Sequence, residues 1–236
     1  MSMATRAQRI LTFGSVAVTL ALAGCTGDDG DANRGGTYTT AMLQAGLLQP
    51  GDVGSTWKRP EQTPPPSTIM QLCPGTAARP PIPGSPTVVT GLLADEGDKG
   101  AQAFEQLGLL YQDAAAMEKA FTALQDTMEA CPPTASRSAG PAKESSEAGY
   151  TESTTIDPLV AGGWKGFVAQ RHKIYEPTYP GSADVAVAVV GQGNAIILTS
   201  YAVYWVGAHS TGPEFSTDWN RITGTVLSRV DAKRAK

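Results

Sequence analysis

Few side chains in this 236-residue sequence are suited to chemistry, and the three cysteines and two histidines are the main ones. A cysteine thiolate is a nucleophile and a metal ligand, and two cysteines can join in a disulfide. Histidine serves as a general base or a metal ligand. His172 and His209 stand alone, outside any HExxH pattern and away from a cysteine pair. The spacing therefore predicts no metal site, and His172 is expected to be an exposed side chain on a strand.

Cys25 lies where a secreted lipoprotein would be cleaved and acylated. Residues 1–9 contain two arginines and no acid, and residues 10–22 are apolar or small. This is the pattern of a secretory signal peptide, and the apolar stretch is shorter than the roughly 20 residues that span a bilayer. The sequence LAGC at 22–25 resembles the bacterial lipobox, which implies loss of residues 1–24 and lipid, such as palmitate, on the Cys25 sulfur. An ordinary signal peptide with a chance cysteine is the alternative.

Residues 25–38 are expected to form a flexible tether, because they are rich in glycine and aspartate and lack large apolar side chains before Tyr38. The whole chain carries 18 Lys and Arg against 22 Asp and Glu, a net charge of −4. Such an acidic balance disfavours nucleic acid as a partner and attraction to anionic lipid. Attachment to the extracytoplasmic face of the cell membrane would therefore depend on Cys25, and no cofactor is predicted.

Cys73 and Cys131 remain as an even pair if Cys25 carries lipid. Outside the cytoplasm such a pair is expected to form a disulfide. The bond would close a loop of about 58 residues, for which the chain-entropy model gives roughly 4 kcal/mol as an upper figure. Two buried free thiols are the alternative.

Motifs for enzyme catalysis are missing from the sequence. It contains no GxSxG and no GxxxxGK[ST], and the glycines at 191 and 193 lack the third glycine of a dinucleotide loop. Glu144, Glu147 and Glu152 lie in a polar stretch that is expected to face solvent. We therefore expect a protein that is not an enzyme. A hydrolase with two catalytic carboxylates stays open, because such a pair needs no sequence signature.

Three helices are expected, at 39–48, 113–130 and 213–230. Asp113 is a plausible N-cap of the second helix, which Pro132 and Pro133 end. Its apolar stripe leads to Cys131, so that thiol is expected to face the core. The apolar side chains of the second and third helices recur every three or four residues: Met117, Ala120, Phe121, Leu124 and Met128, then Phe215, Trp219, Ile222, Val226, Leu227 and Val230.

Strands are expected at 87–95, 149–156, 164–175, 184–190 and 195–204, while 104–112 fits either a strand or a helix. The residues 191–194, GQGN, favour a hairpin turn between the last two strands. Residues 60–86 are proline-rich and contain Cys73, so they are expected to form a loop that the disulfide pins. Residues 134–147 are also expected to form a loop. Consecutive strands with tight turns predict an α+β fold, an antiparallel sheet with packed helices, in one domain over 39–233.

Aromatic and small residues offer the remaining indications. Five aromatic side chains could line a groove for glycan or lipid, with core packing as the alternative: Trp57, Trp164, Tyr201, Tyr204 and Trp205. Three alanines keep part of the hairpin face small, which would either admit a helix or leave a cavity: Ala186, Ala188 and Ala195.

Three features together resemble a known family. They are the early helix followed by LLQPGDVGSTW at 47–57, the amphipathic helix that leads into Cys131, and the late hairpin followed by a terminal helix. This combination is similar to the actinobacterial PknH-like extracellular sensor domain, found on a receptor kinase and on many free lipoproteins. The resemblance implies a sheet with helices, a broad cleft for an unidentified ligand, and no established catalytic residues. That domain has two disulfides, and only Cys73–Cys131 is available here.

Three functions are compatible with these patterns. The first is a membrane-anchored, extracytoplasmic ligand-binding or sensor module, which predicts a pre-formed cleft. The second is an interaction or assembly lipoprotein, which predicts an exposed apolar patch. The third and least favoured is an envelope hydrolase, which predicts paired carboxylates or a Ser–His pair in a pocket. The ligand-binding residues are not identified by the sequence.

Overall fold

The computed structural model describes residues 37–60, 69–76, 80–95, 102–139, 148–177, 181–206 and 215–234, all within one compact unit. The predicted lipid-bearing Cys25 lies outside these residues, as do His209, Glu144 and Glu147. No helix in the described ranges combines the length and apolarity needed to cross a bilayer.

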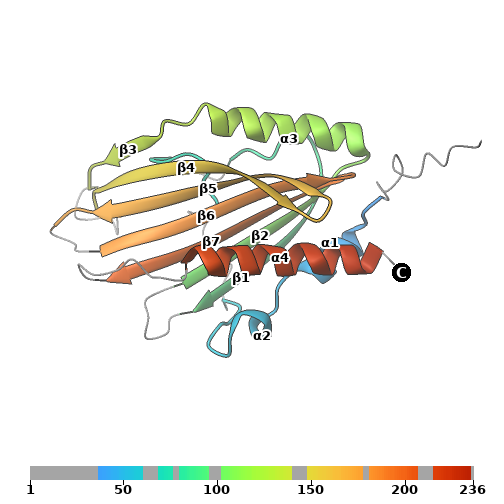
Figure 1. The fold of residues 1–236 in the computed structure, drawn as a ribbon, viewed down its shortest axis with the longest axis horizontal. Coiled ribbons are helices and arrows are strands. Elements are labelled where there is room, and N and C mark those ends of the chain that lie inside the picture. Colours follow the sequence, from blue (N-terminus) through green and yellow to red (C-terminus); the bar gives the residue numbers. More distant parts are fainter. Residues whose placement is uncertain are drawn as a thin grey trace, which may run out of the picture. The chain divides into compact units, whose positions relative to one another are not determined.

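The fold is α+β, as the sequence predicts, with one antiparallel sheet of seven described strands in the order β1-β2-β7-β6-β5-β4-β3 (Figure 1). Consecutive strands pair as hairpins except that β2 pairs with β7, which brings the two halves of the chain together. The strands are β1 (Thr87–Asp95), β2 (Gln102–Leu110), β3 (Thr134–Arg137), β4 (Tyr150–Ala161), β5 (Trp164–Tyr175), β6 (Gly181–Gln192) and β7 (Ala195–Val206).

Four described helices accompany the sheet: α1 (Thr40–Gly46), α2 (Pro50–Val53), α3 (Ala114–Glu129) and α4 (Phe215–Arg234). The predicted cap of α3 is confirmed, because the Asp113 carboxylate accepts the N–H of Ala116 at 2.8 Å. This bond satisfies one of the backbone donors that a helix start leaves without a partner. The helix then ends just before the Pro132-Pro133 pair.

The central hairpin, β6 and β7, is apolar on both faces of the sheet. Val185, Val187 and Val189 point to one face, while Ala186 and Ala188 point to the other. Because successive side chains alternate in direction, a continuous apolar run buries a strand only if both faces are covered. The sheet is accordingly packed between α1 and α4 on one side and α3 with residues 69–72 on the other.

The small residues of the hairpin admit α4. Ala186, Ala188 and Ala195 share a buried cluster with Trp219, Ile222, Val226 and Val230, so the predicted apolar stripe of the last helix is confirmed over its described side chains. Helix α1 packs on α4 through Gly46, where a Cβ would overlap Cγ2 of Val230.

On the opposite face, α3 buries Ala120, Leu124 and Met128 against β6 and β7. Just beyond its C-terminal end Cys131 is bonded to Cys73, with Cα atoms 5.1 Å apart, as the even pair of cysteines predicts. The bond holds residues 69–76 against the part of the face that α3 leaves uncovered.

The structure adds one short helix to the elements expected from the sequence, and it differs from that expectation at residues 134–137 and at the end of β4. Residues 50–53 form the short helix α2, because Gln49 and Asp52 make a capping box around Pro50. Residues 134–137 form β3 rather than a loop, since they add to the edge of β4. Strand β4 continues past Ile156 to Ala161.

Proline in β4 is explained by its position on the edge. The N–H of Thr154 points outward to the carbonyl of Pro133, and Pro158 lies four residues further on, also facing outward. Proline has no N–H to donate at this edge, so it disfavours the addition of another strand there.

Glycine substitutions test the close approach of α1 to α4. Gly46→Ala should lower the free energy of unfolding by about 1–3 kcal/mol, because its methyl group overlaps Val230. Gly224→Ala in α4 is the matched control, since a Cβ there meets nothing within 4 Å. Helix propensity should make that variant more stable by about 0.5–1 kcal/mol. Equal effects in urea denaturation would contradict this packing.

Candidate ligand-binding pocket

A pocket of about 390 Å³ opens on the α4 face, near the N-terminal part of that helix. Segments far apart in sequence build it: residues 53–57, the facing ends of β1 and β2, one residue of β7, and the early turns of α4. Its described lining is Val53, Gly54, Thr56, Trp57, Asp95, Gln102, Tyr201, Asp218, Arg221 and Ile222. A concave site with a few convergent polar groups is the usual form of a small-molecule site.

Two aromatic rings give the pocket an apolar wall. Trp57 and Tyr201 have centroids 6.3 Å apart with a tilt of 34°. The Tyr201 hydroxyl donates to Oε1 of Gln102 at 2.6 Å. Trp57 is positioned by its neighbour Lys58, whose backbone pairs with Ala94 at the outer edge of β1. The rings are thus held by the sheet.

The remaining wall is polar and carries three ionisable groups. Asp95 accepts a hydrogen bond from the Thr56 hydroxyl at 2.9 Å. Asp218 and Arg221 pair at 3.3 Å on the surface of α4. Two carboxylates and one guanidinium leave the lining with both acceptors and donors and a small negative charge.

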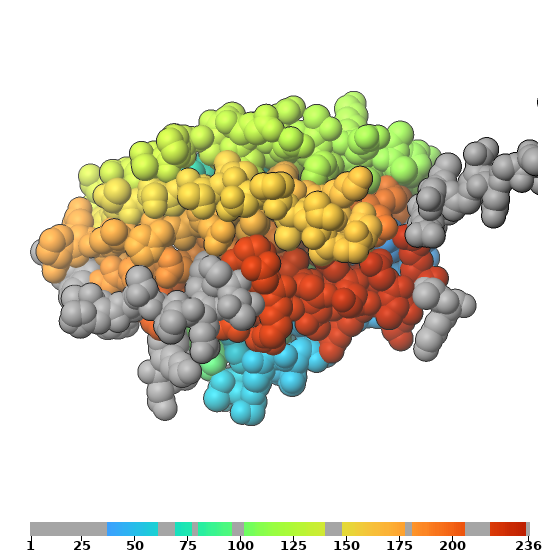
Figure 2. All heavy atoms as spheres, in the orientation of Figure 1, coloured from blue at the N-terminus to red at the C-terminus, as the bar shows by residue number. Residues whose placement is uncertain are grey.

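An ion pair fixes the distance between the two sides of the pocket. Arg229 of α4 donates to both carboxylate oxygens of Asp52 at 2.5 and 2.6 Å, a bidentate arrangement. The hydrogen bond from Arg229 lowers the pKa of Asp52 below its usual value. Figure 2 shows the α2 segment lying directly beside α4. The pair therefore ties the segment that carries Trp57 to the helix that carries Arg221.

Tyr38 anchors the start of the folded chain at the other end of the sheet. Its ring lies 5.0 Å from that of Trp164, and its hydroxyl bonds Gln192 and Asp231 at 2.6 and 2.9 Å. Burial raises the pKa of Tyr38. The sequence places this residue in the tether, but it is 1% exposed and belongs to the folded unit.

The tether anchor lies at the start of β7, whereas the pocket residue Tyr201 lies about halfway along that strand. The backbone N–H of Tyr38 donates to Asn194, next to the first residue of β7, whereas Tyr201 lies six residues along that strand. At about 3.4 Å per residue this is roughly 20 Å. The pocket thus opens well away from the point where the tether enters.

The five aromatic residues named from the sequence do not form one groove. Trp57 and Tyr201 contribute to the pocket lining, but both are also buried in the same core cluster as Trp164. Trp164 lies outside the lining and packs against Tyr38. Tyr204 points to the opposite face of the sheet from Tyr201, as the alternation along β7 requires. Trp205 donates to Asp184 at 3.2 Å.

The expectation that Glu152 faces solvent is wrong. Its side chain is fully buried and pairs with Arg171 of β5 at 3.1 Å. The neighbouring residues Thr151 and Ser153 are exposed. The sequence around Glu152 is therefore polar throughout, although this one side chain points inward. No spacing along the chain marks it, because the cover comes from residues 69–76.

His172 is partly exposed and does not face a nucleophile. Its Nδ1 lies 2.7 Å from a carboxylate oxygen of Asp184, and 41% of the side chain is exposed. No group of three potential ligands among His, Cys, Asp and Glu occurs in the described residues.

A second, apolar hollow of about 320 Å³ lies between α3 and β4. Phe121, Met128, Ile156 and Phe167 contribute its apolar lining, and Glu129 and Asp157 its carboxylates. Ile156 is 45% exposed, and Val160 further along β4 is 69% exposed.

Comparison with known proteins shows the fold. No protein-family model matches the chain, and no curated protein matches it. Among solved structures, the extracellular domain of PknH from Mycobacterium tuberculosis is similar, with a TM-score of 0.56 and 13% sequence identity. The match covers 84% of this chain and 98% of that one. The predicted PknH-like fold is therefore confirmed, and the low identity carries that conclusion no further than the fold.

The Asp52–Arg229 pair predicts a pH dependence of stability. Because the folded state lowers the pKa of Asp52, the pair contributes fully above the unfolded pKa of about 3.9 and is lost as pH falls through the folded pKa. Asp52→Asn should lower the unfolding free energy by about 0.5–1 kcal/mol at pH 7. The difference from the unsubstituted protein should shrink below about pH 3.5.

Urea denaturation across this pH range measures the effect, with Glu118→Gln, on the exposed face of α3, as the matched control. A difference that stays constant with pH would contradict the pairing.

Proposed function

We propose that the protein is a membrane-anchored, extracytoplasmic module that binds a small ligand in the Trp57 pocket and acts as a sensor. The observation that supports this most is the convergence of Trp57, Tyr201, Asp95 and Arg221 from separate segments on one pre-formed cavity. Besides the two rings, the cavity is lined by the buried carboxylate of Asp95 and by the surface ion pair of Asp218 and Arg221. The similar fold of a kinase's extracellular domain is consistent with this role.

The ligand class that fits the lining is a neutral, polyhydroxylated ring such as a glycan fragment. Carboxylates and an amide accept hydroxyl protons, Arg221 donates, and an aromatic wall suits the apolar face of a sugar ring. An acyl chain fits poorly, because Asp95, Asp218 and Arg221 would lose hydration without gaining partners. A strongly anionic ligand would meet two carboxylates.

Attachment through lipid on Cys25 agrees with the position of Tyr38. A tether that ends at Tyr38 would hold the domain by the end of the sheet remote from the pocket. The pocket would then lie roughly 20 Å from the point where the tether enters the folded unit.

Binding is favoured over catalysis by the state of the polar groups. Asp95 is engaged by Thr56 and Asp218 by Arg221. His172, the one histidine in the described part of the chain, bonds a carboxylate and lies outside the pocket lining. A nucleophile with its base is therefore not assembled by these residues.

The alternative function, an interaction or assembly lipoprotein, is supported by a different surface. Ile156 and Val160 are exposed beside the hollow between α3 and β4. A protein partner would bury these side chains and leave the Trp57 pocket empty.

Ligand binding is tested with neutral di- and trisaccharides, anionic sugars and short-chain phospholipids in a thermal-shift assay. A ligand at 100 times its Kd should add about 2.7 kcal/mol to stability, or roughly 5–10 °C in Tm for a chain of this size. Arg221→Gln should raise the ligand concentration needed for the same thermal shift at least tenfold. Arg137→Gln, at an exposed position on β3, should leave that concentration unchanged.

Shifts with phospholipid alone, or equal loss in both variants, would contradict the proposed ligand class. Turnover of a sugar would move Asp95 and Asp218 into the role of catalytic carboxylates.

Lipid attachment is tested by labelling growing cells with an alkyne-bearing palmitate analogue. The protein should be labelled and found in the membrane fraction, and Cys25→Ser should abolish the label. A labelled Cys25→Ser variant, or unlabelled secreted protein, would contradict the anchoring.

A further inference from the structure

Residues 69–76 form neither helix nor strand, and residues 69–72 of this segment are buried. Met70 and Leu72 are buried against the face that carries α3, in the same cluster as Leu198 of β7. This segment lies in the proline-rich stretch, and it covers the sheet where α3 has already ended. Packing on the sheet and the disulfide at Cys73 therefore hold the segment in place.

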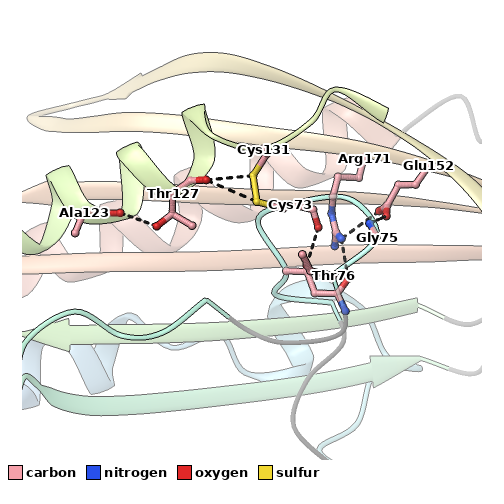
Figure 3. Close-up of a disulfide and its surroundings, with 9 residues drawn as sticks. Cys73, Gly75, Thr76, Ala123, Thr127, Cys131, Glu152 and Arg171 are labelled. Atoms are coloured by element: carbon pink, nitrogen blue, oxygen red, sulfur yellow. Dashed lines mark hydrogen bonds and ion pairs between the residues drawn. A yellow bond between two sulfur atoms is a disulfide. The ribbon is translucent and has the colours of Figure 1, made fainter. Parts of the chain in front are cut away.

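Side chains of the sheet hold this segment by polar contacts. Arg171 donates to the carbonyl of Ile69 at 3.2 Å and to the Gln71 side chain at 3.0 Å. The N–H of Gly75 donates to Glu152 at 2.8 Å (Figure 3). The segment therefore closes over an ion pair whose two side chains are both fully buried.

This arrangement is unfavourable in one respect. A buried ion pair repays the loss of hydration of its two charges only in part. If residues 69–76 lift away, water reaches Arg171 and Glu152 and rehydrates them. Hydration of the pair thus favours the open segment, whereas burial of Met70 and Leu72 favours the closed one.

The Cys73–Cys131 disulfide favours the closed segment, and both of its cysteines are partly exposed to solvent at the end of α3. The carbonyl of Thr127 lies 3.7 Å from the Cys73 Sγ and 3.3 Å from the Cys131 Sγ (Figure 3). The partial exposure of both cysteine residues leaves a thiolate in solvent a route to the bond.

We propose that the Cys73–Cys131 disulfide is a redox-controlled latch: its reduction by a dithiol releases residues 69–76 and exposes the Arg171–Glu152 pair. One thiolate of the dithiol attacks a cysteine sulfur and forms a mixed disulfide, and its second thiol displaces that bond. The protein gains two electrons and two protons as two thiols, while the reductant becomes a disulfide. The Trp57 pocket, on the other face, stays intact.

Hydrogen–deuterium exchange of the full purified chain tests the latch, with and without dithiothreitol. In the reduced protein, amides of 69–76, including Gly75, should exchange at least tenfold faster, while α4 and β6–β7 keep their protection. Reoxidation should restore the original rates. Unchanged protection of 69–76 after verified reduction, or loss of protection throughout the chain, would overturn the proposal.

Two variants separate the bond from the charges. Cys73→Ser with Cys131→Ser should reproduce the open segment without reductant, and general loss of protection in this variant would again overturn the latch. Arg171→Met leaves the Glu152 charge without its ion-pair partner and removes the contacts to Ile69 and Gln71, so 69–76 of the reduced variant should open further than in the reduced unsubstituted protein. If residues 69–76 of that variant open to the same extent as in the reduced unsubstituted protein, the proposed role of the ion pair is overturned.

Discussion

The two-sided apolar surface of the β6–β7 hairpin is the constraint on which the rest of the structure depends. Valines on one face and alanines on the other leave no solvent-facing side, so both faces need a cover. Helix α4, with α1 on Gly46, supplies one cover, and the small alanines allow its close approach. Helix α3 supplies the other but ends at Glu129, and residues 69–76, tied by the disulfide, complete it. The pocket and the latch both form where a helix stops covering the sheet.

Three polar ties then hold irregular segments to this core, and each has a different environment. Asp52–Arg229 is partly exposed and bidentate, so it holds α2 to α4 without much loss of hydration. Tyr38 uses its ring for packing and its hydroxyl for Gln192 and Asp231. Arg171–Glu152 is fully buried and is the least favourable of the three. For this reason the segment above it is the one we expect to respond to a chemical change.

The sequence predicts what neighbouring residues determine and misses what distant ones determine. The Asp113 cap, the stripe of α3 and the tight turn of the last hairpin are local patterns, and the structure has all three. The burial of Glu152 depends on Gly75, 77 residues away in the sequence, so its polar neighbours are misleading. The pocket joins residues 53–57, Asp95, Tyr201 and Arg221, whose spacing has no period. Only the residue types Trp57 and Tyr201 pointed to it, and Trp164 was indistinguishable from them before the fold was known.

The pocket on the α4 face is the central claim of the functional account, and amide chemical-shift mapping tests it most directly. The ¹⁵N-labelled protein would be titrated with the neutral saccharide that gives the largest thermal shift. We predict saturable changes at the amides of Trp57, Gln102, Tyr201 and Arg221, with α3 and β4 unaffected. Changes centred on Phe121, Ile156 and Phe167, or none at millimolar saccharide, would contradict the account and favour the surface between α3 and β4.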